Sequence, residues 1–569
     1  FPREYPDQFR VRVRSVIDDV VRDFRGVLYT LTAAVALLML IACCNVANML
    51  LARATARERE MTVRAAIGAG QSRIVRQLLV ESLLLAVVGG IVGCVIAYGG
   101  VALIVPYVPE GPLPGEVVIA LNGPALLVAL ATAVTSALAF GITPAVFSAR
   151  RNLVDGLRGA GKGVGLERGR VRHALVVAEI ALSLALLFSA GLLMRNFLSL
   201  ARVDLGFDVR NTVAAIPVFL PGSYETMPER RRLYREWIER IAAIPGIEGV
   251  GTTVGLPPFG GNWSEVTVPG ADRGTPVRVL MQWSTDGYFQ AIGARLRTGR
   301  LLTADDGGDQ PRYVAVVNSA FERTYGTGGS VLGQAIGVVL SSPGATSASA
   351  DASNVVRTMF EVVGVIDDVR NRGIKEPAAP EVYLPGFSPG RPPVVIARAT
   401  GAMPATLAAV RESLRAIDPQ VGLYERAIED ELEYTSYAQP RFSLLVLGTF
   451  AVAGGLLVAI GIYSVMAYTV SRQTRDIAVR LALGARRADV CALILRRSAV
   501  LATVGIVVGL LASIGVGRII AAQLWNIPPY DPVTLTVTIA LVLAVALLAT
   551  LIPARRAMRI EPMVALRGD

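Results

Sequence analysis

Few residues in this chain of 569 are of the types that carry out catalysis. There is one histidine, His173, and there are four cysteines, which argues against a His-rich metal site and against a Ser/His/Asp hydrolase. The acidic pairs Asp305-Asp306 and Asp367-Asp368 could bind a metal or act as acid and base, but no His or Cys accompanies them between residues 195 and 439. Solvated turns explain them more simply. We therefore predict no catalytic residue, no metal site and no cofactor.

One segment nearly spells a phosphate-binding loop. Residues 156–163 read GLRGAGKG, which is Gly-x4-Gly-Lys followed by Gly163 where a P-loop has the Ser or Thr that holds magnesium. No strand-like run precedes the segment, and no ATPase domain follows it. We expect this chain not to hydrolyse ATP and not to be an enzyme.

The strongest candidates for a functional site are two loops that share a pattern. Residues 59–69 read REMTVRAAIGA and residues 475–485 read RDIAVRLALGA. Each predicts a short helix with an apolar stripe and a charged flank, ending at a glycine that supplies a left-handed cap. A basic loop that only contacts lipid headgroups is the alternative, but repetition of the sequence favours docking of a partner. The stripe would be Met61, Ile67, Ile477 and Leu483, and the docking residues Arg59, Glu60, Arg64, Gly68, Arg475, Asp476, Arg480 and Gly484.

Long apolar runs must position these loops. The mean hydropathy is +0.51, with 53% hydrophobic and 18% charged residues, whereas ordinary soluble domains carry about 25% charge. Runs of about 20 apolar residues cross a bilayer, and they predict a polytopic α-helical membrane protein with seven spans. These are Val27–Leu51, Leu79–Ile104, Ala125–Phe147, Ala174–Met194, Ser443–Tyr463, Ser498–Ile520 and Val533–Ile552.

The basic residues predict the orientation of the spans. Arginines gather in residues 52–77, 150–173 and 469–497 and in the C-terminal tail, whereas residues 105–124 and 521–533 contain no Lys or Arg. The positive-inside rule then places the basic loops and the C-terminus in the cytoplasm. The net charge of +11 is thus a topology signal that implies contact with membrane lipid and not with nucleic acid.

A large polar region, residues 195–439, separates the fourth span from the fifth and lies outside the membrane in this topology. Strand-like runs alternate in it with helical stretches, so we predict a large α+β extracytoplasmic domain. The predicted strands are Thr212–Val218, Tyr313–Asn318, Phe360–Ile366 and Val394–Ala399, and the helices Glu229–Ala243, Ser319–Tyr325 and Ala405–Ala416.

Three charged residues fall near the ends of predicted spans, where a charge is costly at depth. They are Glu81, Glu179 and Arg497. Either their side chains reach back to the cytoplasmic interface, or they pair inside the helix bundle. Pairing is suggested because the position equivalent to Glu81 in the second repeat is Arg497, which carries the opposite charge.

The chain is an internal duplication. Beyond the loops, Pro144-Ala145 and Leu157-Arg158-Gly159 match Pro553-Ala554 and Leu566-Arg567-Gly568. The second unit has one span, the outer domain and three spans, whereas the first shows only three spans. We therefore expect an N-terminally truncated form of a longer parent. The predicted domains are residues 1–25 (end of a first outer domain), 26–150 (three spans), 151–172 (cytoplasmic linker), 173–195 (one span), 196–440 (outer domain) and 441–569 (three spans).

Several phrases together resemble the FtsX/MacB class of ABC transporter permeases, in the tandem form of acidobacterial orphan permeases. In the membrane part they are Ala42–Arg53, the two repeated loops, Pro440–Phe442, Gly461–Tyr468 and Ile552–Ala557. In the outer domain, Val314–Tyr325, Glu361–Arg370 and Pro380–Pro385 resemble the MacB-like periplasmic core domain.

The resemblance implies a permease subunit of an ABC-type efflux or mechanotransmission system in the bacterial inner (plasma) membrane. Such permeases have four spans and one outer domain per unit and work with a separate cytoplasmic ATPase, which would dock on the repeated loops, and with an envelope or periplasmic partner protein. ATP-driven closure would move the outer domains. The alternative is an orphan membrane-anchored sensor or scaffold that binds an envelope partner. A third possibility, an intramembrane hydrolase, lacks paired catalytic residues within the spans.

Overall fold

The computed structural model divides the chain into two compact units. A helical unit comprises Phe1–Ser199 and Ala438–Asp569, and an outer unit comprises Leu200–Tyr437. The structure describes residues 16–56, 71–107, 122–135, 162–268, 276–307, 312–326, 329–341, 355–387 and 393–558. Each unit is described by itself.

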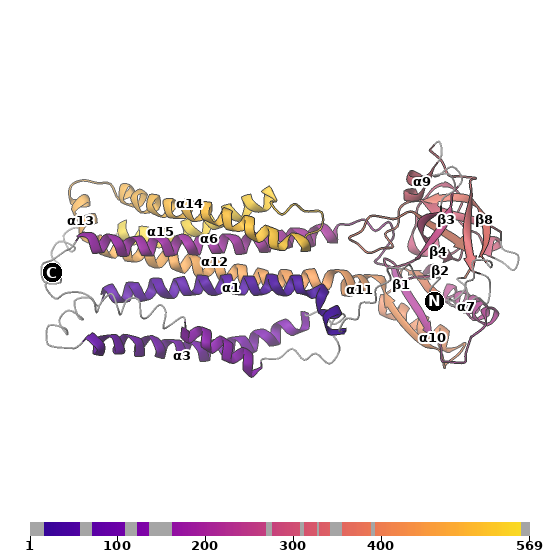
Figure 1. Ribbon diagram of the computed structural model, residues 1–569, viewed down its shortest axis with the longest axis horizontal. Coiled ribbons are helices and arrows are strands. Elements are labelled where there is room, and N and C mark those ends of the chain that lie inside the picture. The colour runs from indigo at the N-terminus through magenta and orange to yellow at the C-terminus, as the bar shows by residue number, and fades with distance from the viewer. Residues whose placement is uncertain are drawn as a thin grey trace, which may run out of the picture. The chain divides into compact units, whose positions relative to one another are not determined.

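The helical unit is built from long apolar helices (Figure 1). They are α1 (Val16–Ala56), α3 (Gln71–Ile104), α6 (Lys162–Ala201), α12 (Ala438–Arg472), α14 (Arg487–Ile520) and α15 (Pro532–Met558), with the short α13 (Thr474–Ala482) between α12 and α14. Within the described residues, six helices are long and apolar enough to cross a membrane. Six of the seven predicted spans therefore have a matching helix. For the seventh, Ala125–Phe147, the structure describes an apolar helix over Gly123–Thr135, and the remainder lies outside the described residues.

Helix α6 forms the centre of this unit. In its most apolar stretch 61% of the residues are buried, against 0% in α3. Its Val176, Ile180 and Leu184 belong to a core with α12, α14 and α15, and one turn further its Leu186 and Ala190 pack with residues of α1 and α12. Figure 1 shows α6 running between α14 and α12. Helix α6 therefore packs against four other helices, α1, α12, α14 and α15.

Two sheets build the outer unit. One has the strand order β11-β1-β10-β2 and is antiparallel throughout. The other has the order β5-β8-β6-β9-β4-β3-β7, and an additional β7–β8 pairing closes six of its strands into a ring. The strands are β1 (Thr212–Val218), β2 (Ile247–Thr253), β3 (Asn262–Thr267), β4 (Val277–Ser284), β5 (Leu296–Gly299), β6 (Val314–Asn318), β7 (Ala335–Ser341), β8 (Val355–Ile366), β9 (Glu381–Pro385), β10 (Val394–Ala399) and β11 (Gly422–Ala427).

Helices cover the four-stranded sheet, which confirms the predicted α+β class. The helices of the unit are α7 (Met227–Ala242), α8 (Tyr288–Ile292), α9 (Ser319–Tyr325), α10 (Met403–Arg415) and α11 (Ile428–Leu432). Helix α7 begins at Thr226, whose side chain forms a capping box with Glu229. Its buried Trp237 packs with β10 and α10 and donates a hydrogen bond to Ser413 Oγ at 2.9 Å. The predicted strands and helices coincide with β1, β6, β8, β10, α7, α9 and α10 to within a few residues, except that β8 begins earlier, at Val355.

Candidate functional site

The second of the two repeated loops forms the helix α13. Asp476 lies in its first turn and Arg480 in its last, which suits the helix dipole at both ends. Gly484 has φ +96°, and the N–H of Ala485 donates to the Arg480 carbonyl at 3.0 Å. This hydrogen bond closes a Schellman motif, which requires a residue in the left-handed conformation. The glycine therefore ends α13 as the sequence predicts.

The two faces of α13 differ in what they contact. Ile477 and Ala478 are buried, and Ile477 belongs to the core of the helical unit. The outward face, defined as Asp476, Val479, Arg480 and Leu483, is exposed, and Leu483 has 82% of its surface accessible. The prediction that Ile477 and Leu483 share an apolar stripe is therefore wrong, because residues six apart point in different directions on a helix. The outward face instead combines two apolar side chains with two opposite charges.

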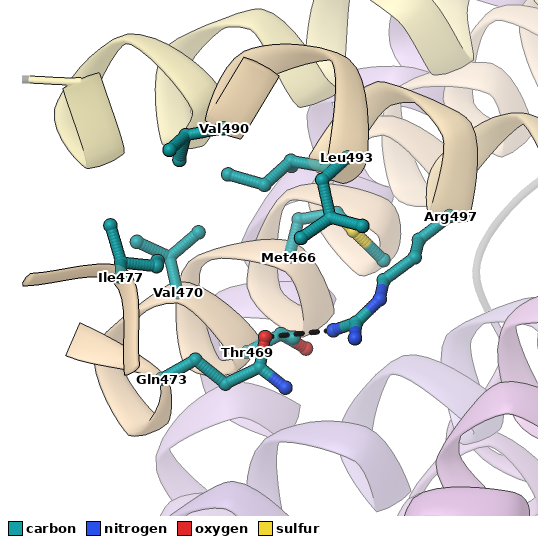
Figure 2. Close-up of a pocket in the computed structure, with 9 residues that line it drawn as sticks. Met466, Thr469, Val470, Gln473, Ile477, Val490, Leu493 and Arg497 are labelled. Carbon is teal, nitrogen blue, oxygen red and sulfur yellow. Dashed lines mark hydrogen bonds between the residues drawn. The ribbon is translucent and has the colours of Figure 1, made fainter. Parts of the chain in front are cut away.

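A small cavity lies behind α13, lined by side chains of α12, α13, α14 and the turn at Gln473 (Figure 2). Its volume is about 20 Å³, which is room for about one water molecule. Arg497 Nη1 donates a hydrogen bond to Gln473 Oε1 at 2.7 Å, as the dashed line in Figure 2 marks. Together with Ile477, this bond holds α13 and the turn at Gln473 against the adjoining ends of α12 and α14.

The structure describes part of the predicted docking set. Arg59, Glu60, Arg64 and Gly68 lie outside the described residues, and so does the side chain of Arg475. Asp476, Arg480 and Gly484 lie on α13 and its cap as given above.

The three predicted intramembrane charges lie in three different surroundings. Glu81 on α3 accepts a hydrogen bond from Gln77 Nε2 at 3.3 Å, and the described hydrogen bond of Arg497 is to Gln473. Glu179 on α6 has 0% of its surface exposed, and its Oε1 accepts a hydrogen bond from Asn48 Nδ2 of α1 at 2.8 Å. The structure thus favours the bundle interior over the interface for Glu179.

Sequence reasoning missed the asparagines of α1. Asn45 and Asn48 are both buried, and they lie three residues apart in an apolar run, on one side of the helix. Two carboxamides at this spacing inside a predicted span were the available signal, because a polar side chain in a span needs a partner.

The acidic pairs of the outer unit differ in exposure: Asp305 is exposed, as predicted for a solvated turn, whereas for Asp306 that prediction is wrong. Asp306 is fully buried and accepts hydrogen bonds from Arg300 at 2.7 and 3.1 Å and from the Thr303 backbone at 2.8 Å. Burial by itself raises the pKa of Asp306, but the bonds from Arg300 and Thr303 outweigh it and hold that pKa below its usual value. Asp367 and Asp368 form ion pairs with Arg297 and Arg323. Among the described residues, no cluster of three potential metal ligands occurs.

A second buried carboxyl of the outer unit has the opposite electrostatics. Glu381 on β9 is 1% exposed and accepts hydrogen bonds from Gln282 Nε2 at 2.6 Å, from Asn371 Nδ2 at 3.0 Å and from the Tyr383 hydroxyl at 2.8 Å. Burial raises the pKa of Glu381 to about 7, and the three hydrogen bonds offset part of that rise. The side chains that donate to Glu381 in the described structure are uncharged. They therefore stabilise the ionised form of Glu381 less than the guanidinium of Arg300 stabilises that of Asp306.

Two family models match this chain. The model described as FtsX-like permease C-terminal matches residues 32–148 and again 448–562, and the model described as MacB-like periplasmic core domain matches residues 174–417. The first of these matches twice, which agrees with the internal duplication.

Curated relatives are similar over parts of the chain. A macrolide export ATP-binding/permease protein MacB of Nitrobacter winogradskyi is 42% identical over 133 residues, which are 22% of this chain and 20% of that protein. A pyoverdine export ATP-binding/permease protein PvdT of Pseudomonas entomophila is 37% identical over 127 residues, 22% of this chain and 18% of that protein. The chain thus spans about a fifth of the length of these relatives. Among solved structures, the periplasmic region of MacB from Actinobacillus actinomycetemcomitans is similar, with 15% identity, a TM-score of 0.27, and coverage of 40% of this chain and 93% of that one.

Proposed function

Because this chain is a permease of the FtsX/MacB type of ABC transporter, we propose that it couples a separate cytoplasmic ATPase to movement of its own outer unit. The ATPase would dock on the outward face of α13 and on the equivalent segment 59–69. The observation that supports this most is the outward face itself. It exposes Val479 and Leu483 beside two opposite charges. Its sequence is repeated in segment 59–69, although membrane topology alone does not require a repeated sequence.

The outward face has the composition of a protein interface. A protein interface buries apolar side chains at its core and uses charges around them to select and orient the partner. Leu483, 82% exposed, is a large apolar side chain on this face, and the charged Asp476 and Arg480 precede it on the same face. A groove that is apolar at its base and carries both charges at its rim would complement this face.

Movement of α13 would be passed into the membrane through its inward face. Ile477 and the hydrogen bond from Arg497 to Gln473 link α13 to α12 and α14. Helix α12 runs over 35 residues from Ala438 to Arg472. Because a helix is stiff along its axis, a shift at the α13 end of α12 is expected to reach Ala438, where the chain of the outer unit joins it.

One chain supplies both permease halves. Helix α1 and helix α12 occupy equivalent places in the two repeats and pack against each other, and Asn45 Nδ2 of α1 donates to the Leu457 carbonyl of α12 at 3.0 Å. We propose that each chain binds two ATPase subunits, one per repeated loop, with these loops and the C-terminus in the cytoplasm. The relatives' names concern export of macrolides and pyoverdine, so an exported small molecule is the proposed substrate class.

Co-purification of the ATPase with the full chain tests the docking proposal. Arg480→Glu and Leu483→Asp should each weaken binding of the ATPase subunit on α13 at least tenfold and leave the subunit on segment 59–69 bound, because an unmatched charge at a docked surface costs more than about 1.4 kcal/mol. Arg555→Glu is the matched control, since Arg555 is an exposed arginine in the last turn of α15 and its reversal changes the net charge equally.

Two outcomes would count against this function. Equal retention by Arg480→Glu, Leu483→Asp and Arg555→Glu would leave α13 as a lipid-headgroup contact. Co-purification of an envelope enzyme or sensor in place of an ATPase would favour the sensor or scaffold alternative. Native mass spectrometry of the retained complex measures the stoichiometry, for which two ATPase subunits per chain are expected.

A further inference from the structure

A polar cluster lies in the interior of the helical unit, where α1, α6 and α12 meet. Glu179 of α6 is fully buried, and its Oε1 accepts from Asn48 Nδ2 of α1 at 2.8 Å. One turn earlier on α1, Asn45 Nδ2 donates to the Leu457 carbonyl of α12 at 3.0 Å. Helix α12 contributes Gly461, against which the carboxyl of Glu179 lies. Three helices that are far apart in sequence thus converge on one carboxyl.

Two polar atoms of this cluster have no hydrogen-bond partner among the described residues. They are Glu179 Oε2 and Asn48 Oδ1, and both are buried. Oε2 is so close to Gly461 that a Cβ built there would lie 2.0 Å from it, and 3.0 Å from Asn45 Oδ1. An ionised carboxylate and a carboxamide oxygen are acceptors only, so this pocket contains oxygen acceptors in excess of donors.

In the part of the chain that the structure describes, no cation balances Glu179. Among the described residues it forms no ion pair, and its hydrogen-bond partner is the neutral carboxamide of Asn48. The titratable side chain that interacts with it is Cys44 of α1, which is neutral as a thiol. Helix α12 faces it with Gly461, and α14 packs against the neighbouring Ile180 through Gly505. A buried charge without a counter-charge is strongly disfavoured.

We propose that Glu179 is a proton-binding site, protonated while α1, α6 and α12 are packed together. A proton on Oε2 removes the uncompensated charge and turns one surplus acceptor into a donor. When the helices separate and water reaches the carboxyl, the O–H bond breaks and the proton passes to water. Each separation of the packed helices therefore releases one proton, and each closure takes one up.

The position of the site determines which movement it senses. Asn45 and Gly461 are equivalent positions of the two repeats. Protonation of Glu179 therefore depends on the contact between α1 of the first repeat and α12 of the second. Glu179 lies on α6, the first span of the second repeat, and the part of the first repeat present in this sequence has no equivalent span. This inference does not rest on the docking proposal, because proton binding and its tests need no ATPase.

Infrared spectroscopy of the full chain in lipid nanodiscs at about pH 7 tests the protonation state. Beside the absorption of Glu381, whose pKa is about 7, the wild type should show a protonated-carboxyl C=O band that Glu179→Gln removes, because the amide replaces the protonated carboxyl without changing its shape. Glu81→Gln, the control on α3, should leave this band in place. Identical protonated-carboxyl absorption in wild type and Glu179→Gln would overturn the proposal.

A second pair of variants keeps the test decisive if Glu179→Gln fails to fold. Gly461→Ala would push a methyl group against Oε2, so we expect it to shift the Glu179 band and lower the melting temperature. Gly455→Ala is the matched control on the same helix, where an added Cβ meets nothing within 4 Å. A Gly461→Ala spectrum with the band unmoved would place the protonated carboxyl elsewhere and overturn the proposal.

Discussion

At the scale of single residues, the nature of the donors decides how a buried carboxyl behaves. Asp306 and Glu381 are both fully or almost fully buried in the outer unit. Asp306 receives two hydrogen bonds from a guanidinium, which stabilises its charge, whereas the described donors to Glu381 are a neutral amide pair and a phenol. The pKa values move in opposite directions as a result.

Glu381 should make the outer unit less stable as the pH rises. Its folded-state pKa of about 7 lies above the ordinary glutamate pKa of 4.5, so the folded state prefers the protonated form. That contribution is fully present below about pH 4.5 and is lost as the pH rises through about 7, by about 1–3 kcal/mol. Melting followed by tryptophan fluorescence at about pH 5 and about pH 8 measures the loss, and Glu381→Gln should reduce it.

The control for this prediction is Glu361→Gln, since Glu361 on β8 is exposed. The pH dependence of melting should be unchanged in this variant. A Glu381→Gln variant with the full wild-type pH dependence would show that another group titrates.

The Arg300–Asp306 pair should matter more to stability than a surface ion pair of the same chemistry. Removal of Arg300 by Arg300→Leu leaves the fully buried Asp306 without its guanidinium and should cost about 1–3 kcal/mol. The comparable Arg297→Leu breaks the pair with Asp367, in which both side chains are exposed by more than a third, and should cost less than about 1 kcal/mol. Chemical denaturation of the two variants compares the costs, and equal losses would contradict the prediction.

At the scale of elements, the same sequence pattern has different surroundings in the two repeats. Gly505 and Gly509 of α14 lie against Ile180, Ala181 and Leu184 of α6. The equivalent glycines of α3 are Gly89 and Gly93, and a Cβ on either would meet nothing within 4 Å. Small residues let two helix backbones approach closely, and within the described residues α14 uses this property and α3 does not.

Substitution of Gly509 should therefore separate α14 from α6. A Cβ at Gly509 would lie 2.8 Å from Leu184 Cδ2 and 3.0 Å from the Ala181 Cα, so Gly509→Val should lower stability by about 1–3 kcal/mol through overpacking. Gly515→Val on the same helix is the control, because nothing lies within 4 Å of a Cβ there. Thermal melting in detergent distinguishes them, and a melting temperature for Gly509→Val equal to that of Gly515→Val would contradict this packing.

At the scale of the whole molecule, the distribution of arginine predicts which side of the membrane each loop occupies. A reporter fused after Asp569 should be cytoplasmic, and one inserted near Gly115 should lie outside, because basic loops stay on the cytoplasmic side. Reporters that are active in only one compartment measure this. Finding both on the same side would show that the number of spans between the two positions is wrong.

The sequence by itself determined the features that depend on local composition. Apolar runs located the six long helices, because crossing a bilayer requires a length of apolar chain and little else. Alternating and periodic patterns located strands such as β1 and β10 and helices such as α7, and the glycine at 484 predicted the end of α13. The duplication and the family were also readable, because both lie in the order of the residues.

Only the tertiary structure decided which distant side chains meet. Glu179 and Asn48 are separated by 131 positions, and no local pattern indicates that α6 becomes the centre of the bundle with this carboxyl facing α1. From the sequence, Asp306 is predicted to lie in an exposed turn, and only the structure shows Arg300 and Thr303 around it. Ile477 and Leu483 are predicted to share one apolar stripe, and only the structure shows that α13 buries the first and exposes the second. Burial and pairing depend on the packing of elements from far along the chain, and hydropathy at one position does not encode that packing.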